Sequence, residues 1–419
     1  MGIEVYKFGG ASVKDAEGVK NATSIMQQKP KGMQLVVVVS AMGKTTNALE
    51  ELLTTRLKSG DWYVKLAGIK YFHAQIIQAL FANPKLILDG LDRYFVRLEN
   101  ALVQANEHSA DKAYDSVIHF GEMLSTFIVF SYALQTGLEA KLIDARHLIK
   151  TDNTYREGKI QWEATQTAIN EQLVPLLKES VAITQGFVGC SEEGFTTTLG
   201  REGSDFTASI LANGLDAEAV TIWKDVPGVL NADPKLFNDT VLFPTLNYYD
   251  AAEMTFYGAT VIHPKTIKPL ADKDIPLKVK SFLDPNEPGT VIKSGEPQPV
   301  VPTLIVKKDQ TLISFGVKDL SFVDELHIGS ILKAFNSCNF KINIMQTSAV
   351  TFSVCVDTKE HLIQQVEAIL KSQFNIHYNE KLTLITVKNY NLKTIESAIG
   401  DGKVLLEQRT RHTYQVIVQ

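Results

Sequence analysis

Short apolar runs alternate with helical patterns along the first half of the chain. Five runs are nearly continuous in apolar character, at residues 5–8, 35–39, 140–143, 181–187 and 219–223. Strands that are buried on both faces have this pattern, because the helices that connect them cover the two faces of a parallel sheet. The pattern predicts an α/β fold, a three-layer αβα sandwich around a mainly parallel sheet.

The region between the second and third runs is poor in strand patterns and rich in helical ones. Ile76, Ile77, Leu80 and Phe81, for example, share one helical face. We expect residues 47–118 to form a helical region that shapes the substrate side of a cleft. In sheets of this kind, ligands bind beyond the carboxyl ends of the strands.

The pattern changes after residue 284. Residues 295–302 are rich in proline and predict a linker. Beyond it we expect strands at 311–317, 340–347, 350–356, 382–387 and 414–418 and near residue 404, with helices at 326–337, 359–370 and 392–398. This order suits ferredoxin-like α+β modules. We therefore expect one domain over residues 1–295 and a second region over residues 303–419.

Residues 196–208 form a candidate anion-binding loop. They place two glycines, an arginine, a hydroxyl and a carboxylate between a predicted strand and a helix expected at 205–213. The amides of a helix N-terminus and the guanidinium of Arg201 can both face a negative charge there. In the simpler interpretation, the segment is a tight loop in which Ser204 caps the helix.

A second segment of this kind opens the chain. Lys7 lies in an apolar run two residues before Gly9 and Gly10, and Ser12 precedes a helix expected at 15–28. Glycine lets backbone amides approach a phosphate, and lysine supplies a positive charge. The alternative is a strand with a glycine turn and a solvent-exposed lysine.

Composition narrows the function classes. The net charge is −5 with no long basic run, so nucleic acid is not an expected partner. The three cysteines are widely spaced, so we expect reduced thiols and no disulfide framework. His119 and His263 have no partners at metal-ligand spacing, so no protein metal site is expected. No signal peptide is recognisable, and the apolar stretch 123–134 is too short to span a bilayer. We expect a cytoplasmic protein without membrane contact.

Several segments together resemble those of aspartate kinases, members of the amino acid kinase family that carry C-terminal ACT domains. Residues 7–12, Lys-Phe-Gly-Gly-Ala-Ser, are similar to the opening signature of these enzymes. Further similar segments follow in the same order at 39–47, 119–122, 143–152, 184–187, 196–208, 225–234 and 257–264. The resemblance covers residues 5–264 and implies the amino acid kinase fold.

The resemblance implies transfer of the γ-phosphoryl group of MgATP to the side-chain carboxylate of L-aspartate. The product would be 4-phospho-L-aspartate, on the route to lysine, methionine and threonine. Lys7 and the amides of Gly9 and Gly10 would stabilise the phosphoryl group, and Asp205 would orient Lys7.

The resemblance also assigns the groups that would bind L-aspartate. Arg201 would bind the α-carboxylate, and Glu122 would accept the α-ammonium group. Hydroxyl groups around the substrate would come from Ser40, Thr46 and Ser204.

For ATP, the implied contacts come from both halves of the first domain. The nucleotide-binding residues would be Lys7, Gly9, Gly10, Ser12, Lys224, Asp225, Leu230, Lys235 and Thr260. Magnesium would arrive with the phosphates. The nucleotide-binding part of the domain departs from the family pattern at three positions. Lys224 stands where threonine is usual, Thr260 where lysine is common, and Glu202 where glycine is common. Glu202 places a negative charge beside the anion site.

The C-terminal region would be regulatory and dimerising, built of two interleaved ACT modules, and would assemble a homodimer or a higher homo-oligomer. Its effector residues would be Asn343, Ile344 and Ser348. Acidic residues flank this segment in lysine-sensitive relatives, whereas Asn343 and Ala349 stand here. Lysine, threonine and no effector are equally open, and the region could serve assembly alone.

Two other functions stay open. The chain could be a non-catalytic amino-acid-binding regulator that kept Arg201 and Glu122 while its nucleotide site diverged. It could also be a kinase of another acidic amino acid, such as glutamate. The retained glycine loop with Lys7, together with Asp205, favours catalysis.

Overall fold

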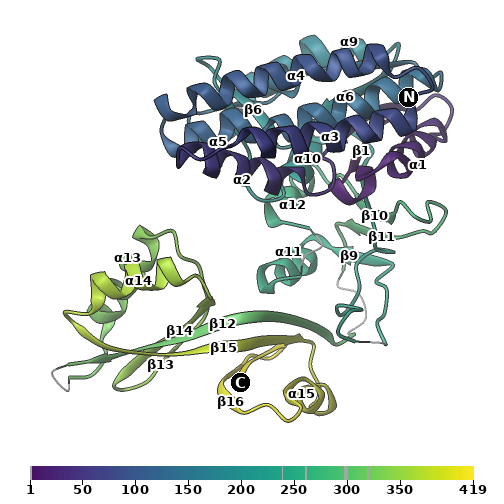
Figure 1. The fold of residues 1–419 in the computed structure, drawn as a ribbon. Helices are drawn as coiled ribbons and strands as arrows, with labels where there is room; N and C mark the ends of the chain where they lie inside the picture. Colours follow the sequence, from purple (N-terminus) through teal and green to yellow (C-terminus); the bar gives the residue numbers. More distant parts are fainter. Residues whose placement is uncertain (1, 238, 260–261, 297–300, 319–320) are drawn as a thin grey trace. The chain divides into compact units, whose positions relative to one another are not determined.

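The computed structural model describes residues 2–237, 239–259, 262–296, 301–318 and 321–419. The chain divides into two compact units (Figure 1). The first comprises residues 1–229, 242–255 and 260–298, and the second comprises 230–241, 256–259 and 299–419. Two short segments inside the first predicted domain therefore belong to the second unit.

An eight-stranded sheet with the order β3-β5-β2-β1-β8-β10-β11-β9 forms the centre of the first unit. Its strands are β1 (Ile3–Phe8), β2 (Gln34–Val39), β3 (Ala140–Leu142), β5 (Val181–Gln185), β8 (Ala219–Lys224), β9 (Thr245–Asn247), β10 (Leu277–Ser281) and β11 (Thr290–Lys293). From β3 to β10 all neighbours are parallel, and β11 pairs antiparallel with β10. The mainly parallel sheet is confirmed.

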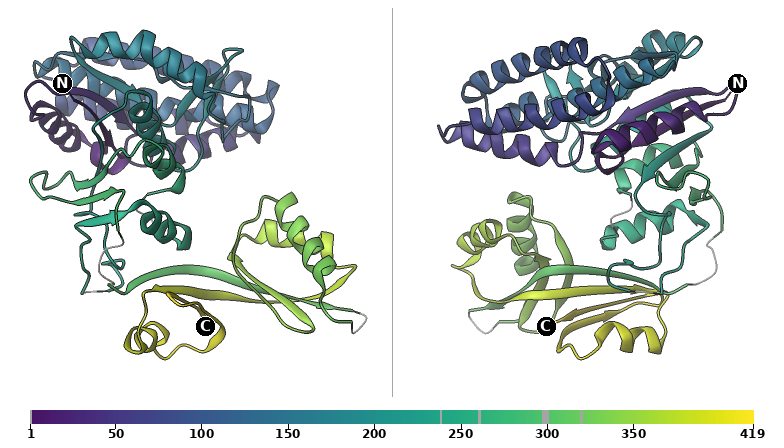
Figure 2. Two further views of the ribbon diagram at one scale, coloured as in Figure 1. Left: turned by 180° about the vertical axis from the view of Figure 1, so that it is seen from behind. Right: turned by 45° about the vertical axis from the view of Figure 1, so that its right-hand side comes forward.

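Helices cover both faces of this sheet. The α6 helix (Phe120–Gln135), with α1 (Ala16–Gln27) beside it, packs on one face, and α10 (Gly203–Gly214), with α12 (Pro264–Ala271) beside it, packs against β1, β2 and β8. Alternate strand residues point to opposite faces. Val37 and Val39 accordingly join the core of α1 and α6, whereas Val36 and Val38 are buried on the other side. The predicted three-layer sandwich is confirmed (Figure 2).

Helices occupy the chain between β2 and β3. They are α2 (Thr45–Leu57), α3 (Tyr63–Leu80), α4 (Lys85–Gln104) and α5 (Ala110–Ile118), and they lie together with α6 in Figure 1. The α5 and α6 helices together span Ala110–Gln135, which is long and apolar enough to cross a membrane by length and composition. The helical stretch is thus longer than the expected 123–134. However, 78% of its most apolar window is buried inside the structure, as in a core helix.

A small separate sheet leads into the candidate anion loop. It consists of β4 (Lys150–Thr151), β6 (Val188–Ser191) and β7 (Thr196–Thr198) in the order β4-β6-β7. The strand expected at 181–187 ends earlier, at Gln185, because Phe187 has a φ of 67° and the chain turns there into β6. The other helices of the unit are α7 (Ala145–Leu148), α8 (Trp162–Ala168) and α9 (Val174–Leu177), and α11 (Tyr248–Tyr257) follows β9.

The second unit contains a six-stranded sheet with the order β13-β14-β12-β15-β17-β16. Its elements are β12 (Thr303–Val317), α13 (Glu325–Ser337), β13 (Ile342–Thr347), β14 (Thr351–Asp357), α14 (Glu360–Leu370), β15 (Phe374–Lys388), α15 (Leu392–Ile399), β16 (Val404–Arg409) and β17 (Thr413–Val418). The central strands, β12 and β15, are each about twice as long as expected, because each runs through both halves of the sheet with register shifts between Lys307 and Leu312.

The two halves of this sheet each have the ferredoxin-like strand order. In the first half, β12 from Gln310, α13, β13, β14, α14 and the beginning of β15 follow one another as βαββαβ. In the second half, the end of β15, α15, β16 and β17 are completed by the beginning of β12, which pairs with β15 from Thr303 to Lys307. The expected ferredoxin-like α+β fold is thereby confirmed, and β12 and β15 each contribute to both halves of the sheet.

The buried histidines of the helical region predict a pH-dependent stability. Burial lowers the pKa of His73 to about 4. Between pH 6.5 and 4 the unfolded chain therefore binds a proton that the folded chain does not, and the free energy of unfolding falls by about 1.4 kcal/mol per pH unit as the pH drops. We expect His73→Met to reduce this slope by about that amount.

Urea unfolding followed by tryptophan fluorescence measures this slope, because all three tryptophans, Trp62, Trp162 and Trp223, lie in the first unit. His147→Met is the matched control, since His147 is exposed. Equal slopes for the wild type and His73→Met would contradict the prediction.

Candidate functional site

Lys7 and Asp205 meet in the interior of the first unit. Lys7 lies near the end of β1 and is 7% exposed, and Asp205 lies in the first turn of α10 and is 3% exposed. The Lys7 Nζ and Asp205 Oδ1 atoms are 2.5 Å apart. A Cβ on Gly9 would lie 3.4 Å from the same Nζ, so the glycine backbone flanks the ammonium group. The structure thus brings the first predicted loop against the second.

Lys224, the last residue of β8, is a second cation at Asp205. Its Nζ atom is 3.8 Å from Asp205 Oδ2. Because β8 pairs with β1, the two lysines extend from the ends of adjacent strands. Burial alone would raise the pKa of Asp205, but Lys7 and Lys224 outweigh it and hold the pKa below its ordinary value. Two ammonium groups therefore face the Asp205 carboxylate, and such groups can also bind an anionic ligand.

Close backbone packing brings the loops after β1, β2 and β8 together. A Cβ at Gly10 would lie 2.7 Å from the carbonyl oxygen of Ala41. The amide of Gly43 donates a hydrogen bond to the carbonyl oxygen of Gly10 at 3.0 Å. The hydroxyl of Ser12 donates to the carbonyl oxygen of Trp223 at 3.0 Å. These loops lie at the carboxyl ends of three parallel strands, where a ligand is expected.

Glu122, in the first turn of α6, is a buried carboxyl group beside the same loops. One of its oxygens accepts a hydrogen bond from the amide of Ala41 at 3.3 Å, and the other accepts none from the residues that the structure describes. Burial raises the pKa of Glu122 to about 8, against the lowering influence of the Ala41 amide and of Lys7. Such a group is stabilised as a carboxylate when a cationic ligand binds.

Ser40 and Thr46 lie on the loop and helix that follow β2. The amide of Ser40 donates a hydrogen bond to the carbonyl oxygen of Phe8 at 3.1 Å. Thr46 is half-buried in the first turn of α2, whose N-cap residue, Lys44, makes no side-chain capping bond. The backbone of Ser40 therefore contacts the end of β1, directly before the glycine loop.

The loop before α10 differs from the interpretation in which Ser204 caps the helix. The N-cap residue is Glu202, with a φ of 55° and a ψ of 28°, and its side chain makes no capping bond. The helix begins at Gly203, so Ser204 lies inside its first turn and is buried. A Cβ at Gly186 would lie 2.4 Å from the Cβ of Ser204, which shows how closely the loop after β5 approaches this turn. Arg201, just before the N-cap, is exposed.

The side chain of Glu202 is partly buried. Its Oε2 atom is buried and makes no hydrogen bond among the described residues. Burial raises the pKa of Glu202, Lys224 opposes this shift, and Asp205 adds to it. The departure from the family pattern therefore lies beside the second lysine.

The other expected nucleotide-binding residues fall into three groups. Asp225 is exposed directly after β8. Leu230 and Lys235 belong to the second compact unit. Thr260 lies outside the described residues.

Asp115 on α5 is a buried carboxylate that sequence patterns did not single out. It accepts hydrogen bonds from the amide of Arg156 and from the amide and hydroxyl of Thr198. Burial raises the pKa of Asp115 to about 6, against the lowering influence of these bonds. Its position three residues before the buried Ile118, on the same face of the helix, is the signal that could have identified it.

Histidines and cysteines form no metal centre in the described part of the chain, where no group of three or more His, Cys, Asp or Glu side chains could hold a metal ion. His119 is buried with its Nδ1 atom 2.9 Å from the carbonyl oxygen of Asp115. His263 caps α12 through a hydrogen bond from the amide of Lys265.

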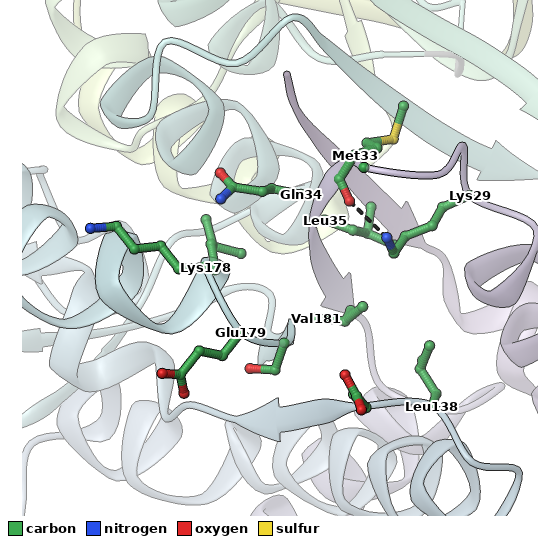
Figure 3. Close-up of a pocket in the computed structure, with 12 residues that line it drawn as sticks. Lys29, Met33, Gln34, Leu35, Leu138, Lys178, Glu179 and Val181 are labelled. Carbon is green, nitrogen blue, oxygen red and sulfur yellow. Dashed lines mark hydrogen bonds between the residues drawn. The ribbon is translucent and has the colours of Figure 1, made fainter. Parts of the chain in front are cut away.

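A separate cavity of about 340 Å³ opens at the other edge of the sheet, beside the amino ends of β2 and β5 (Figure 3). Exposed Lys178 and Glu179 and half-buried Lys29 contribute to its lining. The Lys29 ammonium donates to the carbonyl oxygen of Met33 at 2.7 Å. The loops that follow β1, β2 and β8 lie at the carboxyl ends of the strands, so this cavity is separate from the candidate site.

The expected effector residues lie on and after β13. The side-chain amide of Asn343 donates hydrogen bonds to Gln310 at 2.7 Å and to Asp357 at 2.9 Å. Ile344 is buried, and exposed Ser348 bonds to Thr351 just beyond the strand. The polar group of Asn343 is therefore already paired inside the second unit.

Comparison with known sequences places these features in context. Residues 2–281 match the model of the amino acid kinase family. The chain is 30% identical over 416 residues to the lysine-sensitive aspartokinase 3 of Escherichia coli (strain K12), with 96% of this chain and 89% of that protein covered. It is 31% identical to the chloroplastic aspartokinase 1 of Arabidopsis thaliana, with 86% of this chain and 65% of that protein covered.

Solved structures are similar over almost the whole chain. The crystal structure of E. coli aspartokinase III in complex with aspartate and ADP, in the R-state, has a TM-score of 0.84 at 26% identity and covers 99% of this chain and 96% of that one. The same enzyme in complex with lysine and aspartate, in the T-state, has a TM-score of 0.83.

The close approach of the loops predicts that Gly10→Ala is destabilising. Its Cβ would lie 2.7 Å from one carbonyl oxygen and 3.2 Å from another, so backbone must move. We expect a loss of about 1–3 kcal/mol in the free energy of unfolding, as in overpacked sites.

Gly68→Ala in α3 is the matched control, because a Cβ there meets no atom within 4 Å. It is expected to stabilise the helix by up to about 1 kcal/mol. Urea unfolding measures both variants, and a Gly10→Ala protein as stable as the wild type would contradict the packing argument.

Proposed function

Because the chain belongs to the aspartokinases of the amino acid kinase family, we propose that it transfers the γ-phosphoryl group of ATP to the side-chain carboxylate of L-aspartate. The product is 4-phospho-L-aspartate. The observation that carries the proposal is the buried Lys7–Asp205–Lys224 arrangement beside a glycine loop and Glu122, in a chain with aspartokinase similarity from end to end.

The phosphoryl group lies, in this proposal, between the glycine loop and the two lysines. ATP and aspartate are both anions, so positive charge has to be concentrated where they meet. Lys7 and the amides of Gly9 and Gly10 stabilise the transferred group, and Lys224 adds a second ammonium group. Asp205 orients Lys7, since their contact is 2.5 Å long and buried.

The amino-acid backbone of aspartate is recognised by an opposite pair of charges. Arg201 binds the α-carboxylate through its planar fork, and Glu122 accepts the α-ammonium group. Ser40, Thr46 and Ser204 provide hydroxyl donors. A carboxylate nucleophile needs no general base, so positioning supplies much of the rate acceleration.

Magnesium and the remaining nucleotide contacts belong to the same proposal. The described carboxylates form no cluster for a tight protein metal site, which fits an ion that is held mainly by the ATP phosphates. The ion would neutralise phosphate charge during transfer. Ser12, Asp225, Leu230, Lys235 and Thr260 complete the proposed nucleotide-binding set.

The second unit is proposed to assemble a cytoplasmic homodimer or higher homo-oligomer. Large apolar side chains are exposed on it, with Phe322 at 74% and Leu326 at 79% exposure, as surfaces that bind another copy often have. Light scattering of the purified chain measures the number of subunits. Asn343, Ile344 and Ser348 are the proposed effector residues.

Hydroxylamine trapping tests the reaction directly, because it converts an acyl phosphate into a coloured hydroxamate. The purified chain is incubated with MgATP and aspartate, glutamate or no amino acid. Hydroxamate with aspartate supports the proposal, hydroxamate with glutamate alone indicates another acidic substrate, and binding without hydroxamate indicates a regulator. Adding lysine or threonine distinguishes the effectors.

Lys7→Ala is expected to lower kcat about 10³-fold or more while the fold is kept, because stabilisation of transition-state charge is usually the largest catalytic contribution. ADP release measured with a coupled assay gives kcat, and the tryptophan emission spectrum reports the fold. Lys178→Ala, at an exposed lysine beside the distant cavity, is the control. Near-normal turnover of Lys7→Ala would refute the role.

The raised pKa of Glu122 predicts the pH dependence of aspartate use. With a pKa of about 8, this group is mostly protonated at pH 7 in the free protein and must lose its proton to accept an ammonium group. We expect kcat/KM for aspartate to rise with pH, by at most about tenfold per unit, and to level off above about pH 8.

Glu122→Gln should lower kcat/KM for aspartate and remove most of this pH dependence. The coupled ADP assay between about pH 6 and 9 measures it, with Glu179→Gln, at an exposed position, as the control. A pH profile of Glu122→Gln with the wild-type shape would show that another group titrates.

A further inference from the structure

We propose that Asp115 is a positioning residue of the proposed kinase reaction: it holds the loop that carries Arg201 in place relative to the helix that carries Glu122. The inference rests on the proposed function, in which these two side chains bind the two charged groups of the aspartate backbone. Asp115 itself touches no reacting atom in this proposal.

Both carboxylate oxygens of Asp115 are used, and the residue is fully buried. Oδ1 accepts a hydrogen bond from the hydroxyl of Thr198 at 2.6 Å, and Oδ2 accepts one from the amide of Thr198 at 2.9 Å. The amide of Arg156 donates to both oxygens, at 3.1 and 2.9 Å. One side chain of α5 thus ties down two separate backbone segments.

The segment tied by Thr198 leads directly to Arg201. Thr198 is the last residue of β7, three positions before the arginine. The amide of Gly158 donates to the carbonyl oxygen of Thr198 at 2.9 Å. A Cβ at Gly200 would lie 3.1 Å from the carbonyl oxygen of Arg156, so the backbone just before Arg201 packs tightly on the second segment that Asp115 binds.

The helix that carries Asp115 also leads to Glu122. Asp115 and Glu122 lie seven residues apart on the stretch Ala110–Gln135. His119 interrupts this stretch between the end of α5 at Ile118 and the beginning of α6 at Phe120. The amide of Ala41 donates a hydrogen bond to Glu122. This helical stretch therefore connects Glu122, in the predicted cleft, with Asp115, which binds the segment before Arg201.

Neighbouring side chains of α5 reinforce the same contact. The Lys112 ammonium lies 3.4 Å from the ring centre of Phe195, in the segment before β7. The Arg156 guanidinium lies 4.0 Å from the ring centre of Tyr114. These groups are partly exposed, whereas Asp115 is buried, so the carboxylate makes the contact that water screens least.

An anchor of this kind matters because Arg201 lies on a loop without ladder hydrogen bonds of its own. A displacement of about 1 Å in a substrate-positioning group can lower the rate about 10²-fold. If Asp115 served the fold alone, its loss would lower stability without a selective effect on aspartate.

Asp115→Ala tests the inference. We expect kcat/KM for aspartate to fall about 10- to 100-fold, mainly through KM, while the KM for ATP stays within about twofold of the wild type. Asp115→Asn should largely rescue the enzyme, because its amide oxygen can accept both backbone bonds and its amino group can donate to the Thr198 hydroxyl. Asp89→Asn, at an exposed position of α4, is the control.

A second readout does not depend on activity. Hydrogen exchange of the backbone amides in residues 198–203 should become faster in Asp115→Ala and stay near wild type in Asp115→Asn. If Asp115→Ala does not fold, Thr198→Val, which removes one of the bonds, should give the same selective rise in the KM for aspartate.

The outcomes separate this inference from the proposed function. A wild-type protein that forms no hydroxamate contradicts the function, whatever the variants do. An active wild type whose Asp115→Ala and Thr198→Val variants keep the KM for aspartate, or change the KM for both substrates equally, overturns the positioning role.

Discussion

The buried contact between Lys7 and Asp205 is the interaction on which the arrangement of the first unit depends. It joins the end of β1 to the first turn of α10, so the two candidate anion loops occupy one place in the fold. Replacing one partner of a buried pair leaves the other charge without compensation, but Lys224 still faces Asp205 when Lys7 is replaced. Lys224 adds a second positive charge to the same carboxylate, and the Glu202 carboxyl group lies beside this lysine.

Backbone packing makes this concentration of charge possible. Gly10 and Gly186 allow close contacts that a side chain would block. A Cβ on Gly10 would lie 2.7 Å from a carbonyl oxygen, and a Cβ on Gly186 would lie 2.4 Å from the Cβ of Ser204. The parallel strands end at one edge of the sheet, so their loops share that edge. On the helical side, α5 carries Asp115, which binds the segment before Arg201, and the α6 helix that follows carries Glu122. The proposed chemistry therefore has rigid supports on two sides.

Sequence patterns were most reliable where a single physical requirement decides the structure. Continuous valines predicted β2, and the glycines beside Lys7 predicted a loop directly after the first strand. They failed at the beginning of α10: the helix was expected from Asp205, but it begins at Gly203, and Glu202, in the left-handed conformation, is its N-cap. The extra lengths of β12 and β15 were also missed, because polar residues interrupt the apolar pattern at 307–309 in β12 and at 379–381 in β15.

The sequence by itself determined the α/β order, the family and the residue types of the candidate site, because apolar periodicity and short motifs are local properties of the chain. Only the tertiary structure decided that Lys224 shares Asp205 with Lys7 and that Glu202 turns partly inward. It alone identified Asp115, whose partners Arg156 and Thr198 lie 41 and 83 residues away in the chain. Hydrogen bonds and charges act through space, and residues so far apart along the chain become neighbours only after the layers have packed.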